Sequence, residues 1–143
     1  MKIRQTRALA ITVVAIALAG CGNSGSMSSP TATFKTVLKA QREKDVATYM
    51  KAQSKAGLKS MEVLVKGVGK FKTLEDFYRD MLNDTHTRTM AANDPEIRNE
   101  KIDGDRGSLE FRYPGGEWQT QYFVKEDGEW KEEIVLHVDA ERG

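Results

Sequence analysis

The period of the hydrophobic pattern changes once along this chain, close to Glu96, and this change constrains the fold more than any other feature. Upstream, apolar residues recur at helical spacing; downstream, they alternate with polar residues, as along half-buried β-strands. Helices and strands that are segregated in this way favour an α+β fold over an α/β fold. We therefore expect three N-terminal helical segments packed on a curved antiparallel sheet of about four strands, which together give a cone-shaped domain.

Local signals indicate where the helices begin. Ser29 and Pro30 are typical of an N-cap and a first helical position. Asp45 could cap a second segment, so one bent helix or two short ones fit this region. Another apolar stripe ends at Gly67 and Gly69, and the clearest helix begins at Thr73. The polar stretch from 83 to 95 fits a loop, a frayed helix end or an irregular strand.

Turn residues divide the second half of the chain into short strands. Asp-Gly-Asp at 103–105, Pro-Gly-Gly at 114–116 and Asp-Gly at 127–128 are typical of tight turns between alternating runs. Short hairpin loops favour pairing between neighbours in sequence. The last strand is expected to place Trp130, Ile134 and Leu136 on one face and His137 on the other.

The N-terminal segment has the pattern of an export signal. Lys2, Arg4 and Arg7 precede an uncharged apolar run from Ala8 to Gly20. This run is shorter than the roughly 20 residues that a membrane-spanning helix needs, so we interpret 1–20 as a cleaved signal peptide. The Gly/Ser-rich stretch 21–29 reads as a flexible tether, and 30–143 as a single α+β domain.

The residues Leu18-Ala19-Gly20-Cys21 resemble the lipobox of bacterial lipoproteins. In that family the cysteine at this position carries the lipid, which implies lipidation of Cys21; ordinary cleavage after 17–19 is the alternative. The resemblance implies a membrane-anchored protein of the cell envelope, with its domain on the extracytoplasmic side of the cell membrane or outer membrane. Gly22 is not the Asp that retains many lipoproteins at the inner membrane, which favours the outer membrane in a Gram-negative host.

Three stretches of the domain, 38–46, 102–105 and 123–131, are similar to small exported lipoproteins of the nuclear-transport-factor-two-like (NTF2-like, cystatin-like α+β) superfamily. The strongest local match is the closing hairpin, in which Gly128 precedes Trp130 and Lys131. The resemblance implies a fold more than a function, because one fold hosts many activities.

Ketosteroid isomerases of that superfamily use a Tyr and acidic residues that converge in the cone. Residues of these types here are Tyr49, Tyr78, Asp76 and Asp103. None lies in a motif that matches the catalytic positions, since Asp76 reads as a cap and Asp103 as a turn residue. We therefore expect no catalytic residues and no enzyme.

Aromatic residues form the candidate pocket. On one interpretation they pack the sheet against the helices; on the other, some line a concave apolar pocket for a small ligand. For Trp118 and Trp130 we favour the core. The candidate pocket-lining residues are Tyr49, Tyr78, Phe111, Trp118, Tyr122 and Trp130.

Metal, cofactor and nucleic-acid binding are not expected. His86 and His137 are far apart and lack the spacing of metal ligands. Removing the three positive charges of residues 1–20 from the net charge of +1 leaves −2, which does not resemble a basic nucleic-acid footprint. Lys51, Lys55 and Lys59 share one helix face, which reads as solvated or, alternatively, as attracted to anionic headgroups.

These features predict a membrane-anchored envelope lipoprotein with a non-catalytic domain that binds a small apolar ligand or an envelope protein. The alternative is an isomerase- or cyclase-like enzyme acting on a small apolar substrate in the cone. An enzyme would need an acidic group and a donor facing one buried void. A pure interaction protein would instead show an exposed apolar patch.

Overall fold

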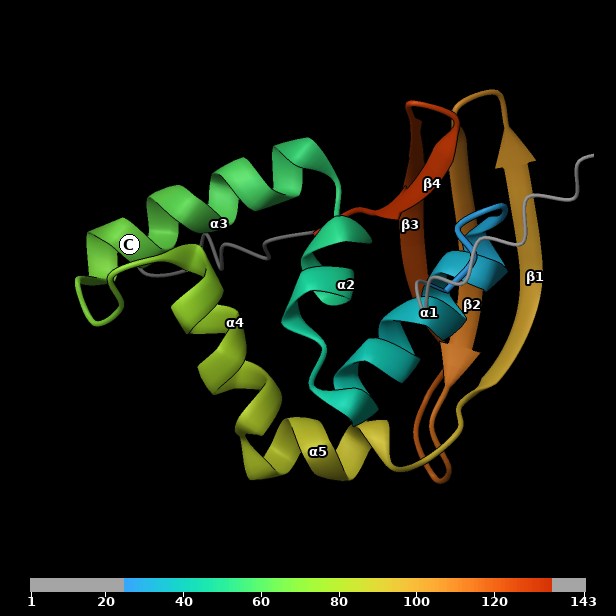
Figure 1. The fold of residues 1–143 in the computed structure, drawn as a ribbon. Coiled ribbons are helices and arrows are strands. Elements are labelled where there is room, and N and C mark those ends of the chain that lie inside the picture. The colour runs from blue at the N-terminus through green and yellow to red at the C-terminus, as the bar shows by residue number, and fades with distance from the viewer. Residues whose placement is uncertain (1–24, 135–143) are drawn as a thin grey trace, which may run out of the picture.

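The computed structural model describes residues 25–134 and shows an α+β fold, which confirms the predicted class. The predicted signal peptide, Cys21, Leu136 and His137 lie outside this range. Five helices precede four strands (Figure 1). The helices are α1 Pro30–Glu43, α2 Val46–Lys51, α3 Lys55–Val68, α4 Leu74–Asn83 and α5 Thr85–Ala91. The strands are β1 Glu96–Asp103, β2 Arg106–Arg112, β3 Gln119–Glu126 and β4 Glu129–Glu132.

The strands form one antiparallel sheet in the order β1-β2-β3-β4, as short hairpin connections favour. The turn between β3 and β4 needs two residues with positive φ, and Asp127 (φ 51°) and Gly128 (φ 80°) supply them. This is the type I′ geometry that Asp-Gly favours. The three turns expected from the sequence therefore set the register of the sheet.

The two edges of the sheet differ. β1 lies at one edge, and its pairing with β2 is interrupted between Arg98 and Lys101, where Asn99 has a φ of 52°. β4 lies at the other edge, where backbone groups of the helical half bind it. Trp130 N donates to Met27 O at 2.9 Å, and Glu132 N donates to Ala52 O at 2.7 Å. The β4 edge is thus covered and the β1 edge is bulged.

Side-chain caps begin the helices at the expected places. Ser29 Oγ accepts from Ala32 N at 3.0 Å, and Pro30 follows it at the first helical position. Thr73 Oγ1 accepts from Asp76 N at 3.0 Å at the start of α4. Each cap satisfies one of the N–H groups that a helix start leaves without a partner.

The expectation of three helical segments is too low, because residues 25–134 contain five helices. Lys44 takes a left-handed conformation (φ 57°) and Asp45 caps the next turn, so α1 and α2 are separate. The stretch left open at 83–95 contains α5. Asp84 Oδ2 accepts from His86 N at 2.9 Å and begins this helix, while Arg42 of α1 donates to Ala91 O at its end.

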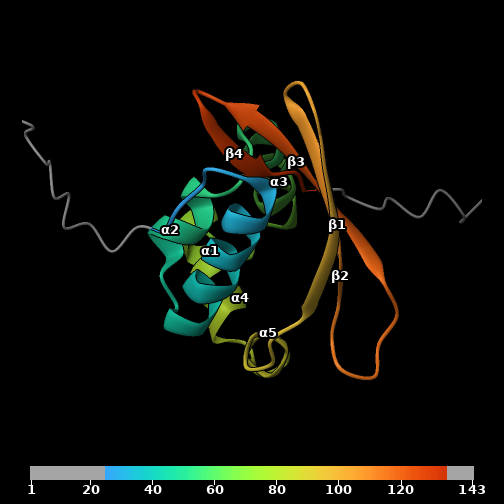
Figure 2. The same cartoon turned by 90° about the vertical axis from the view of Figure 1, so that its right-hand side faces the viewer.

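The helices lie on one face of the sheet, and α1 packs directly against it (Figure 2). The core between them contains Phe34 and Leu38 of α1 and Leu109, Phe123 and Trp130 of the sheet. Gly107 of β2 marks the closest approach: a Cβ there would lie 2.8 Å from Pro30 Cγ and 3.0 Å from a ring atom of Trp130. Because glycine lacks that atom, the first turn of α1 can contact the sheet.

The N-terminal end of the described chain is part of this body. Met27 is 4% exposed and contacts Val37 and Ala52, and Thr36 Oγ1 donates to Ser26 O at 2.7 Å. Of the predicted tether 21–29, the residues from Ser26 on are therefore held by the domain.

Candidate functional site

A cavity of about 380 Å³ lies between the helices and the inner face of the sheet, and it opens to solvent. One wall is apolar, with Phe34 and Leu38 of α1 facing Phe111 of β2. The rings of Phe34 and Phe111 lie with their centroids 5.0 Å apart. The remaining wall is polar, which makes the cavity amphipathic. The lining residues are Phe34, Val37, Leu38, Gln41, Tyr49, Gln53, Met90, Phe111, Tyr113, Gln119, Gln121, Glu132, Glu133 and Ile134.

The polar wall centres on Gln53 and Glu132. Gln53 follows α2 and forms an isolated parallel bridge with Glu132, at the end of β4. The backbone bonds of Ala52 and Ser54 to Glu132 fix this approach at 2.7 and 2.9 Å. Gln53 Nε2 donates to Glu132 Oε2 at 2.8 Å. Two residues far apart in sequence therefore present their side chains to the cavity together.

One acceptor in this wall has no partner. Gln53 is 2% exposed, and its Oε1 makes no hydrogen bond with any described residue. A buried acceptor without a partner costs about 1–3 kcal/mol. The atom is closed to solvent, so a ligand group that donates a hydrogen bond to Gln53 Oε1 would recover this cost after the side chains around it shift.

The Glu132 carboxyl has an unusual environment. Burial among protein atoms raises its pKa to about 7, and the hydrogen bond from Gln53 opposes this shift without cancelling it. The side chain still lines the open cavity, so water can reach it from that side. At neutral pH the group therefore exchanges between a carboxylate, which only accepts hydrogen bonds, and a carboxylic acid, which also donates one.

The charge of Glu132 acts on three tyrosines. Burial, and then the charge of Glu132, raise the pKa values of Tyr49, Tyr78 and Tyr113, that of Tyr78 to about 12. Tyr49 and Tyr113 line the cavity, whereas Tyr78 stacks behind Tyr49 with ring centroids 5.3 Å apart. All three phenols stay protonated at neutral pH, so Tyr49 and Tyr113 can act there as hydrogen-bond donors.

The structure separates the six aromatic residues singled out from the sequence. Tyr49 and Phe111 line the cavity, and Tyr78 lies next to it. Trp130 is buried in the core with Phe34 and Phe123.

The other two aromatic residues, Trp118 and Tyr122, lie away from the cavity. Trp118 stacks against Arg98, with the guanidinium carbon 3.6 Å from the ring centroid, and Arg112 lies 4.7 Å away. Tyr122 pairs with Ser108 and is 49% exposed. Gln121 and Phe123 of β3 point toward the helices, so Trp118 and Tyr122 lie on the opposite face of the sheet.

Gln53 and Glu132 did not stand out in the sequence. Glu132 lies in the charged run 129–133, which resembles a solvated strand, and Gln53 lies in the loop between helices α2 and α3. The sequence held one weak signal for the polar wall. Gln119 and Gln121 alternate in step with Phe123, so the three share one face of β3, and the two glutamines line the cavity.

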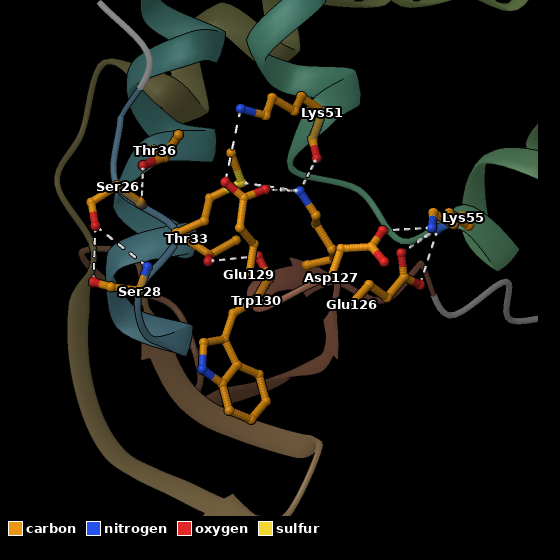
Figure 3. A network of polar contacts seen from close by, with 12 residues as sticks. Ser26, Ser28, Thr33, Thr36, Lys51, Lys55, Glu126, Asp127, Glu129 and Trp130 are labelled. Carbon is orange, nitrogen blue, oxygen red and sulfur yellow. Dashed lines mark hydrogen bonds and ion pairs between the residues drawn. The ribbon is translucent and has the colours of Figure 1, made fainter. Parts of the chain in front are cut away.

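A second polar cluster lies on the far side of β4 (Figure 3). Lys131 is 8% exposed, and its ammonium donates to Lys51 O at 3.0 Å and to Glu129 Oε2 at 2.7 Å. The bond to Lys131 lowers the pKa of Glu129. Thr33 Oγ1 donates to Trp130 O at 3.0 Å. With these bonds satisfied within the protein, the cluster joins α1, α2 and β4 and has a structural role.

Residues 25–134 hold no cluster of three or more His, Cys, Asp or Glu side chains that could bind a metal ion. His86 lies in the first turn of α5. The predicted lipidation site Cys21 and the predicted strand residue His137 are beyond the described range. Within the same range, no helix combines the length and the apolar character needed to cross a bilayer.

Comparisons with known proteins assign no family to the chain. No family model matches it, and no curated protein matches it. Among solved structures, it is similar to a SEC-C motif containing protein from Rhodopseudomonas palustris, at 19% identity over 76% of this chain and 78% of that chain, with a TM-score of 0.42.

The expected membership of the NTF2-like superfamily is wrong, because the matching solved structure is a SEC-C motif containing protein of a different fold family. The structure explains why the closing hairpin resembled that of the NTF2-like superfamily. Asp127 and Gly128 meet the needs of a type I′ turn, and Trp130 fills the core beneath α1. Any antiparallel meander can use the same residues for the same local reasons, so the hairpin does not identify a superfamily.

Proposed function

We propose that this chain is a lipid-anchored protein of the cell envelope whose domain binds a small, mainly apolar molecule without transforming it. The observation that carries the proposal is the unpartnered Oε1 of buried Gln53 in the wall of the 380 Å³ cavity. Ligand sites are typically concave and apolar, with a few converging polar groups that orient the ligand. The cavity has the concave form and an apolar wall, and it adds a larger set of polar groups than is usual.

The chemistry of the walls indicates the class of ligand. Phe34, Leu38 and Phe111 offer an apolar surface to a ring or a short chain. Gln53 Oε1 can only accept a hydrogen bond, and the ionised Glu132 also accepts. The polar end of the ligand should therefore donate, as a hydroxyl, amino or ammonium group does.

Fluorescence titration with 1-aminoanthracene tests this binding, because the probe joins an apolar ring system to one amino donor. We expect saturable binding to the chain that begins at Gly22, made without acyl groups and shown to melt cooperatively. Gln53→Leu removes the acceptor while keeping a side chain of similar size, and we expect it to weaken binding about tenfold, since one buried hydrogen bond contributes about 1 kcal/mol or more.

Two controls make this titration specific. Thr120→Val removes a hydroxyl from an exposed position of β3, and the titration should be unchanged. Anthracene, which lacks the amino group, should bind equally to the original chain and to Gln53→Leu. Equal binding of 1-aminoanthracene to both chains would show that Gln53 is not the anchor, and no saturable binding at all would refute the ligand site.

The lipid anchor is the second part of the proposal, and it is supported by the charge and hydropathy pattern of residues 1–21. Covalent geometry limits the connection from Cys21 to Ser26 to about 18 Å. A domain held at Ser26 would thus stay close to the lipid headgroups. This short connection also suits a ligand that partitions into membranes.

Replacing Cys21 by serine tests the anchor. We expect the protein to leave the membrane fraction, because stable attachment requires two or more acyl chains. Mass spectrometry of the unsubstituted protein should show the added lipid on Cys21. If the Cys21→Ser protein sediments with membranes in unchanged amount, or if Cys21 is unmodified in protein from its native membrane, the anchor is refuted.

One observation favours the enzymatic alternative. Glu132 and the phenols of Tyr49 and Tyr113 line the same cavity, so an acid–base group that titrates near pH 7 and two donors share one void. This set could move a proton at a carbon next to a carbonyl. The test is deuterium uptake from D₂O by a cyclic ketone that the protein binds. Uptake that requires the protein and is lost when Glu132 is replaced would favour this alternative over passive binding.

A further inference from the structure

The lining of the cavity holds carboxyl groups and, among the described residues, no cation. The carboxyl groups belong to Glu132 and Glu133, and the lining contains no Lys, Arg or His. Glu133 accepts a hydrogen bond from the Arg106 guanidinium, so its charge is already paired. Glu132 takes part in no ion pair within residues 25–134, and the hydrogen bond to its carboxyl comes from neutral Gln53. One carboxyl in the cavity wall therefore lacks a counter-ion within the described chain.

This carboxyl is held at the wall, where its charge is costly. The backbone of Glu132 bonds Ala52 O at 2.7 Å and Ser54 N at 2.9 Å, which anchors the residue between β4 and the α2–α3 loop. An ionised group that protein atoms partly enclose loses hydration, and a counter-ion compensates for that loss. For Glu132 the loss raises the pKa to about 7. A ligand that brings a positive charge into the cavity would supply the missing partner.

The other lining groups suit a positively charged ligand. Four aromatic residues contribute from α1, α2, β2 and the position after β2: Phe34, Tyr49, Phe111 and Tyr113. The face of an aromatic ring is electronegative and attracts an ammonium group. Gln53 Oε1, once the side chains around it shift, accepts a hydrogen bond and so favours a cation that carries N–H groups. A quaternary ammonium group has no N–H and would leave this acceptor without a partner.

We infer that the ligand of this cavity is a protonated amine on a small apolar body, and that its ammonium group pairs with the carboxylate of Glu132. This inference rests on the proposed binding function and narrows its ligand class. A hydroxyl or an uncharged amine would leave the carboxylate without a counter-ion. Anionic ligands do not fit, because the described lining offers them no cation. The wall of Phe34, Leu38 and Phe111 receives the apolar body.

The protonation of Glu132 should control this binding. Three phenols face the carboxyl from different elements, namely Tyr49 of α2, Tyr78 of α4 and Tyr113 after β2, and its charge acts on each. Their raised pKa values keep them uncharged between pH 5 and pH 8, so they do not change charge with Glu132. An ammonium group binds the ionised carboxyl, so its affinity should be high above pH 7 and fall by at most about tenfold per pH unit below it.

The charged side chains around the cavity are paired with one another. Arg42 of α1, whose charge acts on Tyr113, bonds Asp94, and Arg106 of β2 bonds Glu133. These pairs leave no free cation of the described chain to take the place of the ligand beside Glu132.

Isothermal titration calorimetry with two matched probes tests the charge requirement. 1-Naphthylmethylamine carries an ammonium group between pH 5 and pH 8, whereas 1-naphthylmethanol has the same ring system and a neutral hydroxyl donor. The full chain is used with Cys21→Ser in every sample, so no acyl chain offers the probes another apolar site. We expect the ammonium probe to bind about tenfold more tightly than the alcohol at pH 8, and the two to bind about equally at pH 5.

Proton release gives an independent readout at pH 7. A bound cation favours the ionised carboxyl, so the ammonium probe should expel part of the proton population of Glu132. Titrations in phosphate and in HEPES, which differ in ionisation enthalpy, should show a release of up to about 0.5 proton for each ammonium bound. The alcohol should release much less.

Two variants assign the effect to one carboxyl. Glu132→Gln removes the charge while keeping the size of the side chain, and it should lower the affinity for 1-naphthylmethylamine at pH 8 about tenfold and abolish the proton release. Its affinity for 1-naphthylmethanol should be unchanged. Glu117→Gln makes the same change in net charge at an exposed position before β3, and both probes should bind to it as to the parent chain.

The outcomes separate this inference from the proposed function. Equal binding of the two probes at pH 8, or an ammonium preference that Glu132→Gln retains, overturns the cationic ligand. If 1-aminoanthracene, which is uncharged at neutral pH, then still binds in a manner that depends on Gln53, the ligand site stands without the charge requirement. If none of the three probes binds, the site itself is refuted. Should Glu132→Gln fail to melt cooperatively, the pH dependence and the proton release of the parent chain decide.

Discussion

Replacing Glu132 by glutamine is expected to stabilise the fold at pH 8 by at most about 3 kcal/mol and to have little effect at pH 4. The carboxyl has a pKa of about 7 in the folded protein, against an ordinary glutamate pKa of 4.5. The folded state therefore binds the proton more tightly, and the stability that Glu132 contributes is present below pH 4.5 and lost as the pH rises to 7. Water in the cavity reduces the effect below this upper limit.

Urea unfolding at several pH values between 4 and 8 checks this prediction. The difference between the two proteins isolates Glu132, because the other ionisable groups are common to both. Glutamine can still accept the hydrogen bond from Gln53 Nε2 through its amide oxygen. Glu117→Gln, at an exposed position before β3, is the control and should leave the curve unchanged. A difference that does not depend on pH would contradict the assignment of a buried, titrating carboxyl.

Truncating Phe123 to alanine is expected to cost about 3–5 kcal/mol of unfolding free energy. Phe123 is fully buried and packs with Phe34, Leu109 and Trp130, where α1 meets the sheet. Native domains typically have an unfolding free energy of about 5–15 kcal/mol, so this loss is a large share of the total. Urea unfolding should show a lower midpoint with an unchanged slope.

Tyr122→Ala is the matched control for this truncation. It removes an aromatic side chain from the adjacent position of the same strand, on the half-exposed face, so its cost should stay within about 1 kcal/mol. Phe123→Leu, which retains most of the volume, should fall between the two and remain folded. Equal costs for Phe123→Ala and Tyr122→Ala would contradict the assignment of the inner face of β3.

Signals confined to a few neighbouring residues predicted the fold class and most boundaries. Ser29 with Pro30, Thr73 and the Asp127-Gly128 turn each act within their own turn of chain, so the sequence alone identifies them. Helix α5 has no apolar stripe. It depends on the cap at Asp84 and on Arg42 of α1, which reaches its last turn from far away in the sequence.

The site was harder to predict because a polar cavity reverses the usual pattern. Along β3 the inward positions are Gln119, Gln121 and Phe123, so two of the three are polar. In the sequence, the alternating aromatic residues Trp118 and Tyr122 therefore suggested that their side of β3 is the buried face, whereas the opposite side is. Gln53 and Glu132 meet only through the bridge between the α2–α3 loop and β4, a contact that no short-range pattern encodes.

The contrast between the two sheet edges bears on how the protein behaves when many copies are concentrated. An open strand edge is a template on which another chain can add a strand and start aggregation. Backbone groups of Met27, Ala52 and Ser54 already occupy those of β4, while the irregularity at Asn99 and the charges of β1 spoil the straight edge that a neighbouring copy would need. Crowded molecules should therefore remain separate, without cross-chain sheets, even where diffusion is restricted to two dimensions.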